Sequence, residues 1–476
     1  MLVIILLALL ASFSLAQAQD TNSINGDDAQ CPVNIPGITH HGNCNLLCRP
    51  ASWTDILVFY LVNYVAHAAT VTTRPGQSML TSLFTIAIAL LLPGGGVRCG
   101  IQAIFNLAKF ADTDLQVAAR AGALCAVVKI RDALPDPQPD SHAEEGGRAM
   151  GGAEGVERQG MRVDPQVLRP KEESRKIVAT KIHGLCRLPE GYDLVVVPRT
   201  ATFERDDQAA DLASPFHEHV RRWLTAPFRV EAVPLTVLCC SYNIVKIFVS
   251  LAQLGFAIAT LYRTRGDQID LYGYAAFGLT VAPYAWMSFV NLAGNIMCPQ
   301  YDTMFVVESS SLDCLRAEAE AAGASDSFMV TGTVGRLTVQ AEAELMRYYA
   351  EVQSRFQAYD SSGAVYAAVV PIAILGGLSR FSPGQSTLYQ RVWTMMWLVF
   401  GCAAGGAVGQ IADHIEGRPV LGSTRHLHQF GFWFIPISIA LFYAAAPIGG
   451  YIVVGHMIKE FGVCYEFKNV GGAEGL

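Results

Sequence analysis

A polar stripe within an apolar segment is the feature that most restricts how this chain can fold. The segment covers residues 271–301, and its polar residues recur at helical steps of four, three and four: Tyr284, Ser288, Asn291 and Asn295. This spacing places them on one side of an α-helix whose other sides are apolar enough for lipid. Polar side chains in lipid need partners on neighbouring helices, so the segment predicts a helix within a membrane bundle.

The composition of the chain agrees with a membrane environment. Of its 476 residues, 51% are hydrophobic and 16% are charged, whereas about 25% are charged in an average soluble protein. The net charge is −7 and no long basic block occurs, so we do not expect nucleic acid as a partner. The 12 cysteines form no zinc-finger spacing, and we predict no metal or other cofactor.

The first residues are predicted to direct the chain into the secretory pathway. Residues 1–18 combine a short apolar run with Ala16-Gln17-Ala18, which has the form of a signal-peptide cleavage site. A retained signal anchor is the alternative, although the run is short for a membrane span. Residues 19–53 are mostly polar and contain Cys31, Cys44 and Cys48, so we expect this segment to lie outside the cytosol.

Seven apolar stretches predict a mainly α-helical fold, a polytopic membrane bundle of about seven spans. They cover residues 56–71, 79–92, 237–262, 271–297, 365–378, 392–411 and 430–457. Several approach the ~20 residues that a span needs. The first, second and fifth are short, and re-entrant or interfacial helices are the alternative for them. The predicted membrane regions are therefore residues 54–97, 233–297 and 362–457.

Seven crossings that start outside leave the C-terminal tail, residues 458–476, in the cytoplasm. Basic residues in the short loops support this orientation, since cytoplasmic loops are enriched in Lys and Arg. The predicted inner loops contain Arg74, Arg263, Arg265, Arg380 and Arg391. We expect a protein of the secretory pathway or plasma membrane, in contact with the lipid bilayer.

Two long hydrophilic regions, residues 98–232 and 298–361, are predicted to extend beyond the membrane. Their patterns indicate short strands and helices around a disordered insert. The expected elements are two amphipathic helices in 97–130, the insert at 132–175, strands in 181–204 and a helix in 339–357.

The cysteines and the basic residues disagree about the side on which residues 98–232 lie. Basic residues between 98 and 131 argue for the cytoplasm. Cysteines argue for the outside, where disulfides persist, and we predict that side. The disulfide candidates form an even set of eight: Cys31, Cys44, Cys48, Cys99, Cys125, Cys186, Cys298 and Cys314.

Short motifs give the chain a resemblance to known sequences. They read PASWTDILVFYLVNYVAHAATV, KIHGLCRLPEGYDL, YGYAAFGLTVAPYAWMSFVNLAGN and LSRFSPGQST. With the hydrophobic pattern, they make the chain similar to an uncharacterised family of fungal multi-pass membrane proteins. The resemblance covers most of the chain outside the signal peptide and the insert. It implies a membrane protein with extended hydrophilic loops, and it implies no catalytic residue.

Two further segments carry polar residues at helical steps and complete what we call the polar seam. The first span adds Tyr60, Asn63 and His67, and the third adds Asn243, Lys246, Ser250 and Gln253. The seam either borders a pathway or holds the helices together through hydrogen bonds worth ~0.6–2 kcal/mol each. Lys246 lies near the membrane edge if its span ends at residue 262, and deep if the span is centred on it. We favour the shallow position.

The motif content excludes the common enzyme classes. The sequence has no GxSxG, HExxH or P-loop motif, and no paired carboxylates lie within its apolar stretches. We therefore predict a non-enzymatic membrane protein of the sensor, receptor or scaffold type. A transporter or channel with a polar seam is the alternative, and a membrane-embedded enzyme is a third possibility without a specific signal.

Overall fold

The structure is a computed structural model of the chain. It describes residues 38–39, 41, 46–130, 181–184, 188–189, 191–204, 238, 240–321, 330, 332–354, 361–415, 420–421 and 430–466. The predicted signal peptide and insert lie outside the described residues, as do Cys31, Cys44, Cys186 and the tail beyond residue 466.

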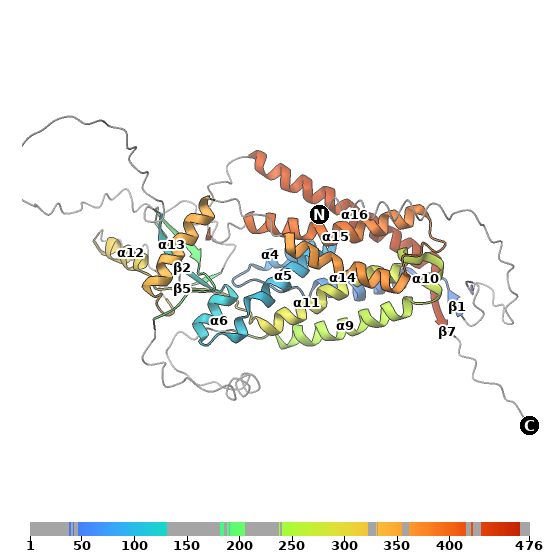
Figure 1. The fold of residues 1–476 in the computed structure, drawn as a ribbon, viewed down its shortest axis with the longest axis horizontal. Helices are drawn as coiled ribbons and strands as arrows, with labels where there is room; N and C mark the ends of the chain where they lie inside the picture. Colours follow the sequence, from blue (N-terminus) through green and yellow to red (C-terminus); the bar gives the residue numbers. More distant parts are fainter. Residues whose placement is uncertain are drawn as a thin grey trace, which may run out of the picture.

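The described chain forms two parts, a helical bundle and a smaller α/β lobe at one end of it (Figure 1). The fold is mainly helical, as predicted. The lobe contains a five-stranded sheet in the order β3-β5-β2-β4-β6. Its strands are β2 (Leu124–Lys129), β3 (Ile182–His183), β4 (Tyr192–Val196), β5 (Met304–Val307) and β6 (Val420–Leu421). Strand β2 runs parallel to β5 and antiparallel to β4.

Helices cover both faces of this sheet: α6 (Asp114–Ala121), α12 (Ser310–Ala321) and α13 (Val339–Ser354). Ala126 and Val128 of β2 belong to one apolar cluster with α6 and α13, and Cys125 and Val127 belong to a second with α12. Side chains alternate between the two faces of a strand, so a strand covered on both faces is apolar throughout.

The lobe confirms most of the local predictions. Strands form in residues 181–204 and a helix forms at α13, as expected. The second amphipathic helix expected in residues 97–130 is partly wrong, because α6 ends at Ala121 and the chain continues as β2. Gly122 adopts a left-handed φ of 75° and ends the helix.

Most helices of the bundle run between the lobe and the opposite end of the molecule, which we call the far end (Figure 1). The first consists of α2 (Trp53–Tyr60), a π-helical turn (Leu61–Val65) and α3 (Ala66–Ala68). The others are α4 (Met79–Leu91), α5 (Pro93–Asn106), α9 (Ile244–Thr264), α11 (Ala282–Met297), α14 (Ser361–Ser379), α15 (Leu388–Ile415) and α16 (Phe430–Phe461). One apolar core joins them.

The predicted fourth span, residues 271–297, is shorter than expected. Helix α10 (Asp267–Tyr272) and 3₁₀ turns at Gly273–Ala275 and Phe277–Val281 precede α11 at the far end. Pro283 lies in the first turn of α11. Proline is favoured there because its missing N–H would have no partner within the helix. Pro283 therefore begins this helix and does not kink it.

The predicted second span is half of a bent pair. Helix α4 ends at Leu91, and the next helix starts at Pro93 at an angle of 118° to it. Before α4, the Gly76 N–H donates to the carbonyl of Tyr301 near the lobe, and after α5, Ala108 packs into the lobe. Both ends of the pair therefore lie at the lobe, and we call it the re-entrant hairpin. A re-entrant helix was the alternative that the sequence left open for this segment.

A seven-span bundle is not supported by the described helices. Among them, α9 is long and apolar enough to cross a membrane, with 21 residues and a mean hydropathy of 1.9, and the bent pair is a second if it counts as one span. The described apolar part of α14 is short, Ala367–Ser379. The side chains of residues 403–415 and 430–442, in α15 and α16, lie outside the described residues.

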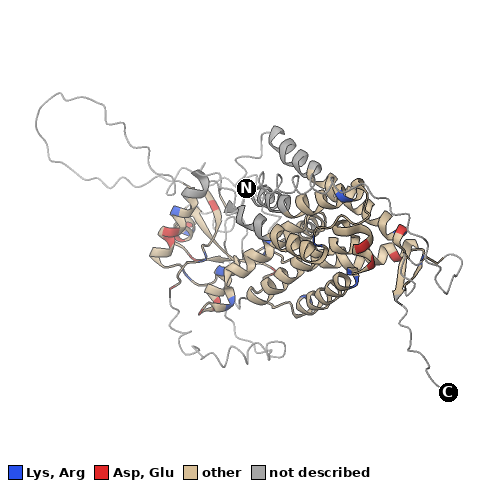
Figure 2. Cartoon of the chain, turned by 45° about the vertical axis from the view of Figure 1, so that its right-hand side comes forward, with Lys and Arg blue, Asp and Glu red and all other residues tan. Residues whose placement is uncertain are grey.

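The two ends of the described chain meet at the far end. Strand β1 (Leu46–Arg49) pairs with β7 (Val463–Glu466), and a Cys48–Cys464 disulfide joins the strands. The prediction that these ends lie on opposite sides is therefore wrong, because paired strands share one side of the bundle. Figure 2 shows Lys, Arg, Asp and Glu gathered over the lobe and at the far end, with few on the helices between.

Candidate functional site

The three predicted polar stripes meet inside the bundle. Helix α11 packs against α3, α5 and α9. His67 Nδ1 lies 2.6 Å from Ser288 Oγ, and Thr260 Oγ1 of α9 donates to Asn63 Oδ1 at 3.0 Å. The first stripe thus contacts the helices that carry the other two. The polar seam is one feature of the bundle, and it divides into two halves with different hydrogen bonding.

The half nearer the far end is the tyrosine half, which consists of Tyr60, Tyr64, Thr280, Tyr284 and Tyr451. All four phenols have partners. Tyr60 donates to the backbone carbonyl of Tyr451 at 2.5 Å, and the Tyr64 hydroxyl lies 2.6 Å from Thr280 Oγ1. Tyr284 and Tyr451 both donate to the carbonyl of Leu90, at 2.5 and 2.8 Å. Every phenol of the tyrosine half therefore has a hydrogen-bond partner.

The carbonyl of Leu90 explains why two phenols converge there. Leu90 lies in the last turn of α4, where carbonyl groups lack N–H partners within the helix. The phenols that reach this carbonyl come from α11 and α16, and an unpaired backbone group between packed helices is costly. The phenols of Tyr284 and Tyr451 replace the missing donors. The tyrosine half therefore holds the tip of the re-entrant hairpin.

The half nearer the lobe is the amide half, which consists of His67, Ser250, Gln253, Ser288 and Asn291. All except Gln253 are fully buried. Several atoms lack a hydrogen-bond partner among the described residues: His67 Nε2, Ser250 Oγ, Gln253 Oε1 and both amide atoms of Asn291. A buried polar atom without a partner costs about 1–3 kcal/mol. The amide half therefore has hydrogen-bonding groups that the described residues do not satisfy.

Glycines let α5 approach the amide half closely. A Cβ atom added at Gly100 would lie 2.7 Å from Asn291 Oδ1 and 2.8 Å from Val290 Cγ1. A Cβ at Gly96 would overlap the side chain of Met287. Helix α5 thus covers Asn291 closely and leaves no room for a molecule between them.

Three further seam residues lie at the lobe end and have partners. Asn243 Oδ1 caps α9 by accepting the Lys246 N–H at 3.0 Å, and Lys246 Nζ donates to the carbonyl of Val71 at 3.2 Å. Asn295 Nδ2 donates to the carbonyl of Thr70 at 3.4 Å, and its Oδ1 accepts from Gln300 Nε2 at 3.1 Å. Lys246 lies in the first turn of α9, at the lobe end of that helix.

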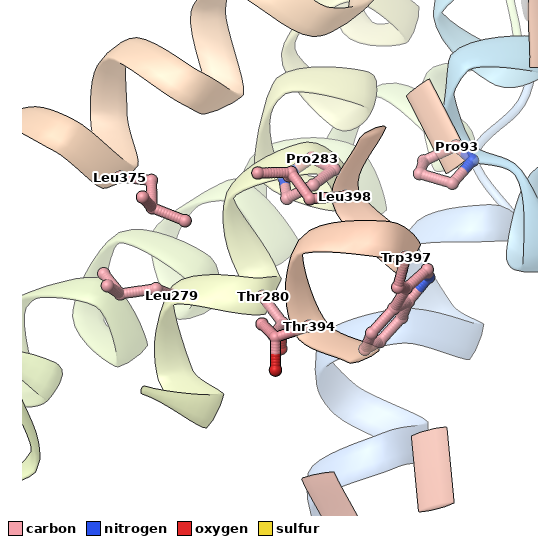
Figure 3. A pocket seen from close by; sticks show the side chains of 8 residues that line it. All are labelled: Pro93, Leu279, Thr280, Pro283, Leu375, Thr394, Trp397 and Leu398. Carbon is pink, nitrogen blue, oxygen red and sulfur yellow. The ribbon is translucent and has the colours of Figure 1, made fainter. Parts of the chain in front are cut away.

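A narrow cavity lies beside the tyrosine half (Figure 3). It offers about 10 Å³ to water, which suits a single molecule. Thr394 Oγ1 has no partner in the described part of the chain and could bind that water. The lining residues are Pro93, Leu279, Thr280, Pro283, Leu375, Thr394, Trp397 and Leu398.

The cysteines pair differently from the prediction. Cys48 is bonded to Cys464, which was not among the candidates, whereas Cys99, Cys125, Cys298 and Cys314 keep free thiols. Cys125 is enclosed in the sheet, where burial raises the pKa of its thiol to about 12. His41 lies near Cys48 and Cys464 as a possible third metal ligand, but the two sulfur atoms are bonded to each other and cannot both coordinate a metal.

Sequence reasoning missed several residues of the seam. Tyr451 lies in an apolar stretch beside Gly449 and Gly450, and no helical polar pattern marks it. Thr280 precedes α11 in a 3₁₀ turn. Its position next to Tyr64 depends on how two distant segments pack. The nearest local signal for this turn was Pro283, which marks the start of the helix that follows it.

Comparisons with known proteins identify no relative. No protein-family model matches the chain, and no curated protein or solved structure matches it. The resemblance to fungal multi-pass membrane proteins therefore stays a prediction, and the function has to be inferred from the geometry.

Proposed function

We propose that the chain is a multi-pass membrane protein whose amide half binds a small polar solute, as in a transporter or channel in a closed state. The observation that carries this proposal is Asn291, which is fully buried with both amide atoms unpaired among the described residues. Native proteins leave few buried polar groups unpaired, and each exception calls for an explanation. A solute that supplies the missing hydrogen-bond partners would explain why an amide occupies this buried position.

The proposed crossings are six: residues 56–71, which include most of the first helix, and α9, α11, α14, α15 and α16. The re-entrant hairpin is inserted from the lobe side. The surface of α9 supports a lipid contact, because Val245, Phe248 and Phe256 are 72%, 67% and 59% exposed. Re-entrant segments are tolerated in membranes where protein buries them. The tip of this hairpin meets that condition, since Gly94 packs against the backbone of Cys402 in α15.

We assign the far end to the oxidising, non-cytosolic side and the lobe to the cytosol. The Cys48–Cys464 disulfide supports this assignment, because disulfides persist outside the cytosol. The lobe end carries the free thiols of Cys125, Cys298 and Cys314. It also carries the basic residues Lys109, Arg120 and Lys129, as expected for a cytosolic side. An even number of crossings leaves both chain ends on one side, as the β1–β7 pairing requires.

Thiol labelling tests the assignment. Cys314 is exposed on α12. In sealed microsomes, whose cytosolic face points outward, a membrane-impermeant maleimide should label Cys314 without detergent. The Cys314→Ser variant identifies the labelled site, because its signal should fall by the contribution of that thiol. Labelling of Cys314 only after detergent contradicts the assignment.

A ligand screen tests the proposed site. The purified full chain in detergent is heated with a panel of small charged and uncharged polar solutes. A ligand present at 100 times its Kd stabilises the folded state by about 2.7 kcal/mol. At least one solute should raise the Tm of the wild type but not that of Asn291→Leu. Tyr284→Phe, a change in the tyrosine half, should keep the response. No response across the panel, or an equal response in Asn291→Leu, contradicts the proposal.

A sensor, receptor or scaffold is the second candidate function. The lobe favours it, because this part has its own sheet and two apolar clusters at one end of the bundle. In that case the seam only holds the helices together, and solutes would not bind at Asn291. The same screen distinguishes the two functions.

A further inference from the structure

We propose that the solute of the amide half is small and uncharged, and that it both donates and accepts hydrogen bonds, as urea and glycerol do. This inference rests on the proposed function and names its substrate class. It follows from the atoms that the amide half offers, from the charges that are missing around them and from the space that α5 leaves.

The unpaired atoms of the amide half offer both donors and acceptors. The Asn291 amide has two N–H donors on Nδ2 and an acceptor at Oδ1, and the Ser250 hydroxyl can act in either way. His67 Nδ1 is engaged with Ser288, so His67 Nε2 adds one further group whose role depends on the tautomer. A solute that matches these atoms must itself carry both donors and acceptors.

No charged side chain belongs to this half. The nearest ionisable group on α9 is Lys246, four residues before Ser250, or about 6 Å along the helix axis, and its ammonium group donates to the carbonyl of Val71. The strongly buried charged residue of the described bundle is Arg391, near the start of α15 at the far end. A cation at Asn291 would therefore lack a counter-charge, because α5, α9 and α11 carry no Asp or Glu, and an anion would gain one only if Lys246 left the carbonyl of Val71.

The missing counter-charge decides between an ion and a neutral solute. Burying an ion costs several kcal/mol even after the protein relaxes, and an opposite charge is the usual compensation. Neutral amides and hydroxyls can replace the hydrogen bonds that an uncharged solute makes with water, at little electrostatic cost. The chemistry of the amide half therefore favours the uncharged solute.

The packing of α5 restricts the size of the solute. An added Cβ at Gly100 would already lie within 3 Å of Asn291, and one at Gly96 would overlap Met287. A solute between α5 and Asn291 therefore requires a displacement of α5, and a small solute requires the smallest displacement. The glycines give this helix a smooth face, which suits such a movement.

Solute flux tests this inference. The full chain is reconstituted in liposomes, and reswelling in urea or glycerol after a hyperosmotic shift is followed by light scattering. Potassium and chloride fluxes are measured separately with a potential-sensitive dye. We expect urea or glycerol flux several-fold above that of empty liposomes and no ion flux. In Asn291→Leu the solute flux should fall about tenfold, the change expected for a loss of about 1.4 kcal/mol.

Two further variants keep the test decisive. Ser250→Ala removes a hydroxyl that has no described partner, so it should fold normally and still reduce the solute flux. Asn63→Leu makes the same chemical change as Asn291→Leu outside the amide half and should keep the flux of the wild type. Ion flux that depends on Asn291 overturns the uncharged solute but keeps the proposed function. Water flux alone, no flux at all, or solute flux unchanged in both Asn291→Leu and Ser250→Ala overturns both.

Discussion

The tyrosine half and the amide half of the polar seam are built from the same helix but differ in their hydrogen bonding. Tyr284 and Asn291 lie seven residues apart on one side of α11, and both are fully buried. The phenol of Tyr284 bonds to Leu90 and Tyr451, whereas the amide of Asn291 bonds to no described residue. The same stripe thus contains a satisfied network and an unsatisfied one.

The difference shows what polar residues can do inside an apolar bundle. In the tyrosine half the polar groups repair a defect of the backbone, because they bond to a carbonyl at a helix end. In the amide half no backbone defect explains the polar groups, and their burial lowers stability. Stabilisation explains the first set, and the second set is the basis of the proposed ligand site.

The largest expected effect concerns the re-entrant hairpin, which contacts both halves. In Gly94→Ala the new Cβ would overlap the backbone carbonyl of Cys402, which cannot move as a flexible side chain would. We expect a loss of about 3 kcal/mol or more, measured as a lower Tm of the purified chain in detergent. Gly255→Ala is the matched control, because nothing lies within 4 Å of its added Cβ, and it should stabilise α9 by about 0.5–1 kcal/mol. Equal Tm values for the two variants would show that the hairpin is not held against α15.

The next effect tests the satisfied half. Tyr284→Phe or Tyr451→Phe alone leaves the other phenol on the Leu90 carbonyl, so each should cost about 0.6 kcal/mol. The double variant leaves that carbonyl unpaired and should cost about 2 kcal/mol. In a double-mutant cycle, the Tm change of the double variant should therefore exceed the sum of the changes of the two single variants. Strict additivity would mean that Leu90 does not need either phenol.

The amide half should respond in the opposite direction. Asn291→Leu replaces an unpaired amide with an apolar group of similar size, so we expect the stability to rise by about 1 kcal/mol. Asn63→Leu removes an amide that bonds to Phe59 and Thr260, and its stability should fall by a similar amount. A loss of stability in Asn291→Leu would show that the amide has a structural partner and would remove the contrast between the halves.

The sequence predicted those parts of the fold and the seam that depend on local patterns. Spacing along the chain was enough to place Tyr284, Ser288 and Asn291 on one helical side, and the structure brings this side against His67 and α9. The periodicity also located α13 and the strands in residues 181–204. Such patterns are visible because the residues of one helix side or one strand lie close together in the sequence.

The parts that the sequence did not predict depend on contacts between distant segments. Pro93 and the following glycines marked the end of an apolar stretch, but the return of α5 toward the lobe depends on the contact of Gly94 with Cys402. The partner of Cys48 was missed because Cys464 was assigned to the opposite side of the membrane. The division of the seam into two halves depends on Leu90 and Tyr451, which carry no polar periodicity of their own.

The smallest expected effect concerns a network of polar side chains at the far end. Hydrogen bonds and ion pairs there should stabilise the fold less than hydrogen bonds inside the bundle. At the far end, Arg49 donates to both carboxylate oxygens of Asp55 at 2.8 and 2.9 Å, and the Ser52 N–H donates to the same group at 2.8 Å. The hydrogen bonds from Arg49, followed by those from Ser52, hold the pKa of Asp55 well below its usual range. The stabilisation is therefore present above the unfolded pKa of about 3.9 and is lost as the pH falls further.

The Tm of wild type and Asp55→Asn measures this network as a function of pH. Asp55→Asn should have the lower Tm at neutral pH, by less than any change expected within the bundle, because water screens an exposed pair. The difference should shrink as the pH falls below about 4, where the carboxylate of the wild type begins to lose its advantage over the unfolded chain. Asp302→Asn, at an exposed carboxylate with no ion pair to a described residue, is the control for the substitution itself. A difference as large as that of the tyrosine double variant would mean that Asp55 is shielded from water, and the contrast between the bundle and the far end would then fail.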